Sequence, residues 1–195
     1  MIHSPLGLQT PGADLPAPSF AQGAPGRPFV APTFILGVDP GLSGALAFYE
    51  PETGDLVVVD TPILTIKEGG KLKSKPDVYA LGILLDHWRP LIKYAVVEKV
   101  SAMPDQGVTS SFNFGDVFGC VRGAIAANII PMHMVQAREW KGVLKLPGGK
   151  ANKDESRALA SKLMPRHAGR WNLKKHDGRA EAALLAWYGH KHLKL

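Results

Sequence analysis

The stretch from Phe34 to Gly44 constrains the fold of this chain more than any other. An apolar run, Phe34-Ile-Leu-Gly-Val, stops at the carboxylate of Asp39, and the turn pair Pro40-Gly41 precedes a second apolar run. Short apolar runs bounded by turn residues are typical of buried strands. A carboxylate that ends such a strand is held at the rim of a sheet, where a metal ligand or catalytic acid is well placed. Taken alone, Asp39 is more readily explained as a turn former, so its meaning depends on other carboxylates that can reach it.

The order of the expected elements predicts a mixed α/β domain. Apolar runs at 34–39, 43–49 and 56–60 are joined by short turns, so we expect three antiparallel strands. A helix over 78–88 precedes a fourth run at 94–98, and a strand reached through a helix is expected to lie parallel to the first. The remaining elements are expected to be a strand over 129–135, helices over 112–127, 138–144, 153–164 and 177–188, and polar loops over 65–76, 101–110, 147–150 and 165–176.

Composition bounds the domain organisation. Residues 1–32 are rich in Pro, Gly and Ala and almost uncharged, so we expect a disordered leader before one folded domain over 33–195. The single cysteine, Cys120, excludes an internal disulfide framework and a cysteine-built zinc site. No apolar run approaches the length of a membrane span, and the leader lacks a secretory layout. We expect a location in the cytoplasm of a bacterium or a phage-infected host cell, with organellar import as the alternative.

Charge is distributed unevenly along the chain. Residues 33–135 hold 8 Lys and Arg against 11 Asp and Glu, whereas residues 136–195 hold 14 against 5, a surplus of +9. A basic region of this kind indicates a polyanionic partner, most simply nucleic acid. The alternative is a charged surface that only keeps a small protein in solution.

Three further carboxylates can join Asp39. Glu98 repeats its pattern, because the apolar run Ala95-Val-Val97 ends at this residue; on parallel neighbouring strands the two side chains emerge at the same edge, where they repel unless a cation lies between them. On the last helix, Asp177 and Glu181 are four residues apart and share one face. Glu181 precedes four apolar residues expected to pack on the sheet, an unfavourable place for an unpaired carboxylate.

Four carboxylates would form an all-oxygen site, which suits Mg²⁺ or Mn²⁺ rather than zinc. Two such ions, ~3.5–4 Å apart, can activate a water and stabilise the leaving oxygen of a phosphodiester. The surrounding basic residues can hold the nucleic-acid backbone electrostatically. The sequence therefore favours a metal-dependent nuclease.

The segments Gly37-Val-Asp-Pro-Gly-Leu-Ser-Gly44, Tyr94-Ala-Val-Val-Glu98 and 174–188 carry a family resemblance when taken together in this order. They resemble the RuvC-type Holliday junction resolvases of the ribonuclease H-like (retroviral integrase) superfamily. The stretch Lys153-Asp-Glu-Ser-Arg-Ala-Leu-Ala160 and the later Asp177-Gly-Arg-Ala-Glu181 are most similar to the phage and chloroplast branch. The resemblance covers about residues 34–190; its first motif alone is weak, because sugar-kinase-like ATPases also open with an Asp on such a strand.

The resemblance implies a ribonuclease H-like fold and a homodimer that binds four-way DNA junctions and nicks two strands symmetrically. The four metal-binding acids that it implies are Asp39, Glu98, Asp177 and Glu181. It also implies a catalytic role near the scissile phosphate for Lys153. The chain departs from the family at two positions: chloroplast relatives often have His where Asp177 stands, and bacterial resolvases usually have Asp where Glu181 stands. Because His176 is adjacent, either His176 or Asp177 can supply the ligand at that position.

Several DNA and dimer contacts are expected around the acids. Relatives place a wedge residue in the loop after Glu98, which makes Met103 the candidate for insertion between bases, although loop packing explains it equally well. Phe112 and Phe114 are expected in the core, with a partner or DNA as the alternative. Glycines repeating every four residues are the candidate dimer contact and allow close approach to the sheet or another helix: Gly115, Gly119 and Gly123. Candidate backbone contacts are Lys145, Lys150, Lys174 and Lys175, together with Lys67, Lys71, Lys73 and Lys75.

Three other functions compete with the junction resolvase. A ribonuclease H-like enzyme could act on flaps or RNA–DNA hybrids, and a non-catalytic protein could bind junctions without cutting them. Four acids facing a polyanion argue against the second of these. A sugar-kinase-like ATPase is disfavoured because the chain is short for two lobes and has no second phosphate loop.

Overall fold

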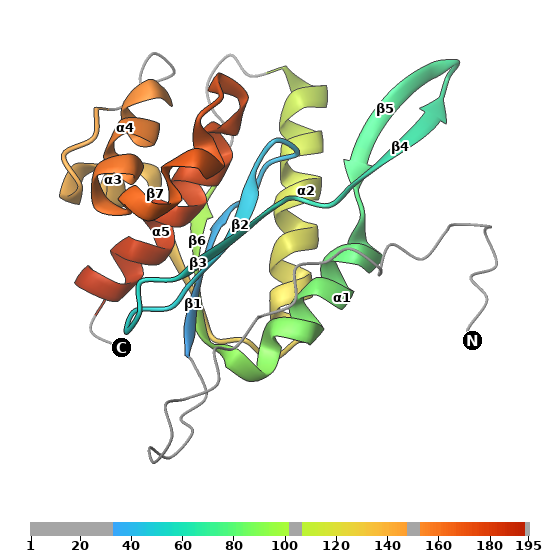
Figure 1. The fold of residues 1–195 in the computed structure, drawn as a ribbon. Coiled ribbons are helices and arrows are strands. Elements are labelled where there is room, and N and C mark those ends of the chain that lie inside the picture. Colours follow the sequence, from blue (N-terminus) through green and yellow to red (C-terminus); the bar gives the residue numbers. More distant parts are fainter. Residues whose placement is uncertain (1–32, 102–106, 148–152, 194–195) are drawn as a thin grey trace.

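A five-stranded mixed sheet forms the centre of the molecule (Figure 1). The computed structural model describes residues 33–101, 107–147 and 153–193. The strands are β1 (Phe34–Asp39), β2 (Ala45–Tyr49), β3 (Leu56–Asp60), β6 (Ile92–Lys99) and β7 (Met132–Gln136), in the order β3-β2-β1-β6-β7. β2 is antiparallel to β1 and β3, whereas β1, β6 and β7 are mutually parallel. These strand directions are the ones predicted from the sequence for a ribonuclease H-like fold, with strand bounds that differ by only a few residues.

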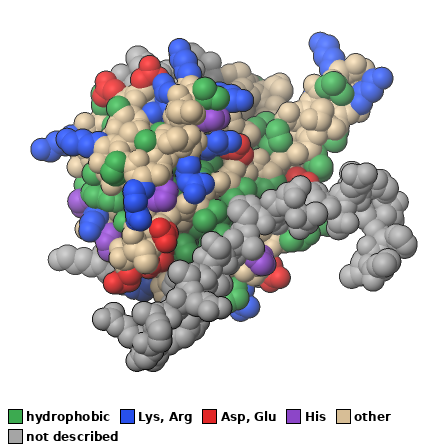
Figure 2. All heavy atoms as spheres, in the orientation of Figure 1, with side chains coloured by type: hydrophobic (Ala, Val, Ile, Leu, Met, Phe, Trp, Pro, Cys, Tyr) green, Lys and Arg blue, Asp and Glu red, His purple; other side chains and the backbone are tan. Residues whose placement is uncertain are grey.

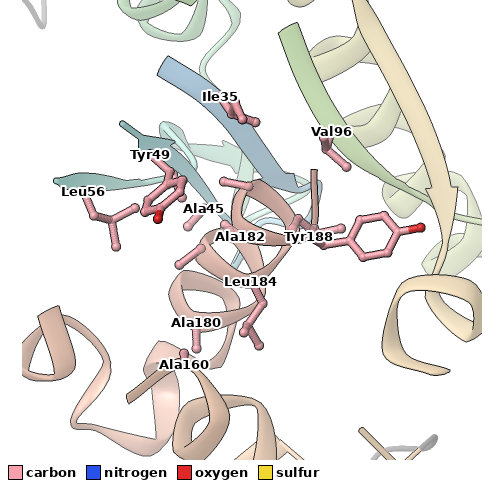
Figure 3. Packing of buried hydrophobic residues seen from close by; sticks show 14 of the residues in the cluster. Ile35, Ala45, Tyr49, Leu56, Val96, Ala160, Ala180, Ala182, Leu184 and Tyr188 are labelled. Carbon is pink, nitrogen blue, oxygen red and sulfur yellow. The ribbon is translucent and has the colours of Figure 1, made fainter. Parts of the chain in front are cut away.

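Helices cover the two faces of the sheet in different ways. One face packs against α1 (Val78–Trp88) and α2 (Val108–Ala127), where Trp88 stacks on Phe48 with ring centroids 4.2 Å apart. The other face packs against α5 (Asp177–His192), with α3 (Ala137–Val143) and α4 (Lys153–Leu163) beside it. Figure 3 shows Ile35 and Val96 of the strands together with Leu184 and Tyr188 of α5. The sheet therefore has an apolar core on each of its two faces.

Helix α5 lies directly on β1, and a glycine makes this approach possible. A Cβ atom on Gly37 would lie 2.0 Å from the carbonyl oxygen of Ala182 and 2.4 Å from the amide nitrogen of Ala186. The side of α5 that faces β1 carries the small side chains of Ala182 and Ala186, so the helix backbone packs close to the strand backbone. The amino-terminal end of α5 is thereby held against the carboxyl end of β1.

The segment expected as a polar loop over 65–76 is a β-hairpin, and that prediction was wrong. β4 (Ile63–Glu68) and β5 (Lys71–Pro76) pair antiparallel and project beyond the body of the molecule (Figure 1). The two residues between them, Gly69 and Gly70, both have positive φ angles of 58° and 78°. A Gly-Gly pair with two positive φ values is the geometry of a two-residue hairpin turn. The strands were missed because the segment has few apolar residues and no alternating apolar pattern. Such a pattern is not needed here, since nearly all residues of the hairpin are exposed.

Other differences are smaller. The first helix spans 78–88 as expected, and its N-cap is Asp77, whose side chain accepts a hydrogen bond from the Ala80 amide at 2.9 Å. The loop expected over 165–176 contains two short 3₁₀ helices, Pro165–Trp171 and Lys174–His176. A third, Arg89–Leu91, follows α1.

Two expectations about α2 also changed. Phe112 is 73% exposed and therefore does not belong to the core, whereas Phe114 is partly buried. The helix presents Gly115, Gly119 and Gly123 to open space, since a Cβ atom on any of them would meet nothing within 4 Å. Within the described part of the chain, these glycines are therefore not in close contact with the sheet or with another helix. None of the helices in the described ranges has the length and apolar character needed to cross a bilayer.

Candidate active site

Two carboxylates meet at the carboxyl edge of the sheet. Val38 of β1 pairs with Val97 of β6 in the parallel register, so the next residues, Asp39 and Glu98, end neighbouring strands side by side. Because side chains alternate along a strand, both point to the same face as Gly37 and Val96, the face covered by α5. The sequence prediction that Asp39 and Glu98 lie together is therefore consistent with the strand register.

Helix α5 brings the other two carboxylates to this edge. A Cβ atom on Gly178 would lie 2.9 Å from the Asp39 carboxylate and 2.5 Å from the Ser43 carbonyl oxygen, so the first turn of α5 touches the end of β1. Asp177 begins that turn, and Glu181 follows one turn later. We refer to Asp39, Glu98, Asp177 and Glu181 as the carboxylate cluster.

The cluster strongly changes the ionisation of Asp39. Burial, followed by the charges of Glu181, Glu98 and Asp177 in that order, together raise the pKa of Asp39 to about 8 against a lowering effect of Lys141. The pKa of Glu98 is also raised, mainly by burial, although a hydrogen bond from Trp140 opposes the shift. A buried carboxylate surrounded by like charges is a site that favours a bound cation.

Three polar side chains hold the cluster in place, and sequence reasoning missed all of them. The indole Nε1 of Trp140 donates to Glu98 Oε2 at 2.8 Å. The Glu181 Oε1 atom accepts from Lys141 Nζ at 2.8 Å and from Ser156 Oγ at 3.0 Å. Lys141 and Trp140 follow β7, the third parallel strand, whose carboxyl end lies at the same edge as those of β1 and β6. A helix that directly follows a third parallel strand begins at this edge, so the predicted strand order could have placed α3 next to the acids.

The structure places His176 and Asp177 in different surroundings, while their roles as ligands stay a prediction. The charge of Asp177 acts on Asp39. The side chain of His176 instead experiences the charges of Arg179, Lys175, Asp60 and Arg157, none of which belongs to the carboxylate cluster, and burial is the main cause that lowers its pKa. Asp177 is therefore the one that the fold brings to the carboxylates.

The donor chemistry of the cluster fits a hard divalent cation, since all four side chains offer oxygen atoms. Within the described ranges, however, no three His, Cys, Asp or Glu side chains are gathered closely enough to hold a metal ion as they stand. Glu181 is partly neutralised by Lys141 and Glu98 is turned toward Trp140. The four side chains are therefore of the right type for a divalent cation. In this structure, however, Glu98 and Glu181 accept hydrogen bonds from protein donors.

The remaining site predictions have mixed outcomes. Met103 and Lys150 lie outside the described residues. Lys153 begins α4, the helix whose Ser156 reaches Glu181. The other candidate DNA contacts are exposed: Lys145 after α3, and Lys174 and Lys175 immediately before α5. Figure 2 shows Lys and Arg side chains scattered over the visible face, with several on the same side as α4 and α5.

Comparison with known proteins gives matches in structure but none among family models or curated sequences. Among solved structures, RuvC from Thermus thermophilus aligns with a TM-score of 0.47 and 18% identity, covering 81% of this chain and 96% of that one. The T. thermophilus RuvC in complex with a Holliday junction substrate aligns with a TM-score of 0.48 and 16% identity over the same shares.

Proposed function

We propose that this protein is a RuvC-type, structure-specific DNA endonuclease that nicks four-way junctions symmetrically as a homodimer. The observation on which the proposal depends is the partly buried Asp39 carboxylate, raised in pKa to about 8 by burial and by three neighbouring acids at the carboxyl edge of the sheet. Such a charge cluster is costly to the fold unless it serves a bound cation. The surplus of basic residues after residue 136 supports a polyanionic substrate.

In this proposal the acids Asp39, Glu98, Asp177 and Glu181 hold two Mg²⁺ or Mn²⁺ ions. When bound, such ions supply an activated water and stabilise the leaving oxygen of a phosphodiester. Asp39, placed between the other three, would contribute to both ions. Lys153, at the start of α4, is assigned to the scissile phosphate.

Cation binding requires the ion pair between Lys141 and Glu181 to open, because the ammonium group now stands where a cation would be attracted. Lys141 would then be free to neutralise a phosphate. Trp140 and Ser156 act as positioning residues for Glu98 and Glu181, since each donates a hydrogen bond to one carboxylate oxygen.

The test is nicking of a synthetic four-way junction with Mg²⁺ or Mn²⁺. We expect two symmetric nicks, and we expect Asp39→Asn to lower the rate by more than about 100-fold, beyond the loss typical of substitutions next to a metal ligand. Junction binding in EDTA should persist in this variant. The matched control is Asp86→Asn, an exposed acid on α1 on the opposite face of the sheet, which should cut normally. A wild type that binds junctions but cuts with neither metal would refute the proposal.

One observation favours a second function, that of a non-catalytic junction-binding protein. The described part of the chain holds no ready-made metal site, and Lys141 already neutralises Glu181. This alternative predicts tight junction binding without cleavage and without any rise in melting temperature on addition of Mg²⁺. A panel of flaps and RNA–DNA hybrids in the same assay separates the resolvase from other ribonuclease H-like nucleases.

A further inference from the structure

The β4–β5 hairpin takes no part in the carboxylate cluster, yet it leaves the sheet at the same edge. Asp39 of β1 and Asp60 of β3 both pair with Ala45 of β2, so the carboxyl ends of β1 and β3 lie in one row. The hairpin begins at Ile63, three residues after β3 ends. Figure 1 shows it projecting away from the body beside the amino-terminal half of α2.

One face of the hairpin is basic. Lys71, Lys73 and Lys75 alternate along β5, so their side chains share a face. Directly opposite them on β4 are Glu68, Ile66 and Leu64. Figure 2 shows blue side chains at the far end of the projection, and the hairpin segment holds lysines but no arginine. We call this surface, formed by Lys71, Lys73 and Lys75, the lysine face.

The lysine face has a defined orientation at its base. Lys75 Nζ lies 3.5 Å from Asn113 Oδ1 and 3.9 Å from Asp116 Oδ2, both on α2. These contacts turn the base of the face toward α2. Further out, Lys73 pairs with Glu68 at 2.9 Å, but both side chains are about half exposed, at 51% and 55%. An exposed pair of this kind contributes little to stability, so Lys73 can exchange Glu68 for another anion.

The charge of the hairpin differs from that of its surroundings. The hairpin segment 63–76 holds four Lys and one Glu, whereas the rest of 33–135 holds 4 Lys and Arg against 10 Asp and Glu. Three lysines at alternate strand positions span about 14 Å, which equals the axial rise of about four phosphates along one DNA strand. A basic projection from an acidic part of the chain, at the edge of the candidate active site, is complementary to a polyanion that extends outward from that site.

We propose that the lysine face binds the sugar-phosphate backbone of a double-helical DNA arm, at a place separate from the carboxylate cluster. The inference rests on the proposed function only for the identity of the polyanion. It assigns the hairpin a role in affinity and not in chemistry, because Lys71 and Lys73 lie on the projection while the carboxylate cluster lies between the sheet and α5.

The test uses the variant Lys71→Gln/Lys73→Gln and leaves Lys75 in place, so that the contact with α2 is kept. Binding to a plain DNA duplex and to a four-way junction is measured in EDTA over a salt series. Each lost phosphate contact lowers the slope of log K against log salt by about 0.9, so we expect a slope smaller by about 2. We expect the affinity to fall by about 3- to 10-fold at moderate salt. The variant Lys71→Arg/Lys73→Arg should retain both slope and affinity.

The charge-matched control is Lys93→Gln/Lys191→Gln. Both lysines are exposed, and they lie at the amino-terminal end of β6 and in the last turn of α5. Gly189 of α5 packs against Ile35 and Tyr94, near the start of their strands, so these lysines mark the opposite edge of the sheet. The control should bind DNA as the wild type does. An equal loss of affinity in the control would overturn the inference, because net charge alone would then explain the effect.

Two further outcomes overturn it as well: an unchanged salt slope in the hairpin variant, or a changed oligomeric state with unchanged DNA binding, which would assign the lysine face to a second copy of the chain. The outcomes for the two proposals are distinguishable. If the wild type never cuts junctions but the hairpin variant loses duplex affinity with a smaller slope, the proposed function fails and this inference stands. If the wild type cuts junctions and the hairpin variant binds DNA normally, the proposed function stands and this inference fails.

Discussion

Asp39 shows how a single residue can oppose the stability of the fold that holds it. Its carboxylate is buried beside three other acids, and the pKa near 8 means that the folded protein holds this proton up to mildly alkaline pH. The unfolded chain releases the same proton near pH 4. A group whose pKa is raised on folding contributes stability that is present at low pH and lost as the pH rises through the folded value.

The substitution Asp39→Asn should therefore stabilise the metal-free protein at alkaline pH. Between about pH 4 and pH 8 the unfolded wild type is ionised at Asp39 while the folded wild type is not, so its free energy of unfolding falls as the pH rises. The amide introduced by Asp39→Asn does not titrate, so the variant does not lose this stability. Since one pKa unit corresponds to ~1.4 kcal/mol, we expect the difference in free energy of unfolding to grow by about 2–4 kcal/mol from pH 5 to pH 8.5. Urea denaturation in EDTA at both pH values measures it. Asp86→Asn should show no such pH dependence, and a constant difference for Asp39→Asn would contradict the burial of its charge.

Lys141 provides a second prediction at this scale. Its ammonium group lies 2.8 Å from Glu181 and lowers the pKa of Asp39, so it competes with any cation for the carboxylate cluster. We expect Lys141→Met to bind Mg²⁺ about 3- to 10-fold more tightly, a change of about 1 kcal/mol. The measurement is the rise in melting temperature with Mg²⁺ concentration. Lys162→Met, at the far end of α4, is the control and should match the wild type; equal affinities for all three would show that Lys141 does not compete.

At the scale of elements, the contact between α5 and β1 builds the site. The helix carries two of the four acids, and its distance from the strand is set by the missing side chain at Gly37 and by the small side chains of Ala182 and Ala186. A larger residue at this contact would lift the helix and move Asp177 and Glu181 away from Asp39. The geometry of the acids therefore depends on a residue that has no functional group.

Gly37→Ala should disrupt both folding and the site. Its Cβ atom would lie 2.0 Å and 2.4 Å from backbone atoms of α5, which cannot move without displacing the helix. We expect a loss of about 3 kcal/mol in the free energy of unfolding, at the upper end for an overpacked core, with weaker Mg²⁺ binding in the fraction that folds. The control is Gly82→Ala on α1, where the new Cβ meets nothing and stability should be unchanged or higher by about 0.5–1 kcal/mol. Similar stabilities for the two variants would exclude this close contact.

At the scale of the whole molecule, the sheet separates two different surfaces. The α3–α4–α5 side builds the carboxylate cluster, whereas α2 on the other side presents an exposed Phe112 and an open row of glycines. A four-way junction has two-fold symmetry, so cutting it twice calls for a two-fold symmetric enzyme. We therefore predict that the dimer contact lies on the side of α2 that carries Gly115, Gly119 and Gly123.

We predict that the protein is a dimer in solution and that Gly119→Glu, in the middle of the stripe, dissociates it. A charged side chain placed in a close helix contact costs several kcal/mol when it is buried without a partner. Light scattering coupled to size exclusion measures the mass. Gly82→Glu on α1, where a Cβ also meets nothing, is the control and should remain dimeric. A Gly119→Glu variant that stays dimeric would place the contact elsewhere.

The sequence alone determined the central sheet and the edge at which Asp39 and Glu98 lie. Apolar runs that end in Asp39 and Glu98, linked by a helix, already imply parallel neighbours with two acids at one edge, because strand direction and side-chain alternation are local rules. The spacing of Asp177 and Glu181 likewise follows from the helical repeat. These features depend on residues close together in the chain.

The tertiary structure decided what depends on distant contacts. The exposed hairpin gave no apolar pattern to read, and its Gly69-Gly70 turn was the local sign that remained. The approach of Lys141, Ser156 and Trp140 to the acids joins segments about 25 to 42 residues apart. The placement of Asp177 beside Asp39 follows from how closely α5 packs on β1. Burial by that same packing raises the pKa of Asp39, because the free energy of a charge depends on everything that surrounds it and not on its neighbours in the chain.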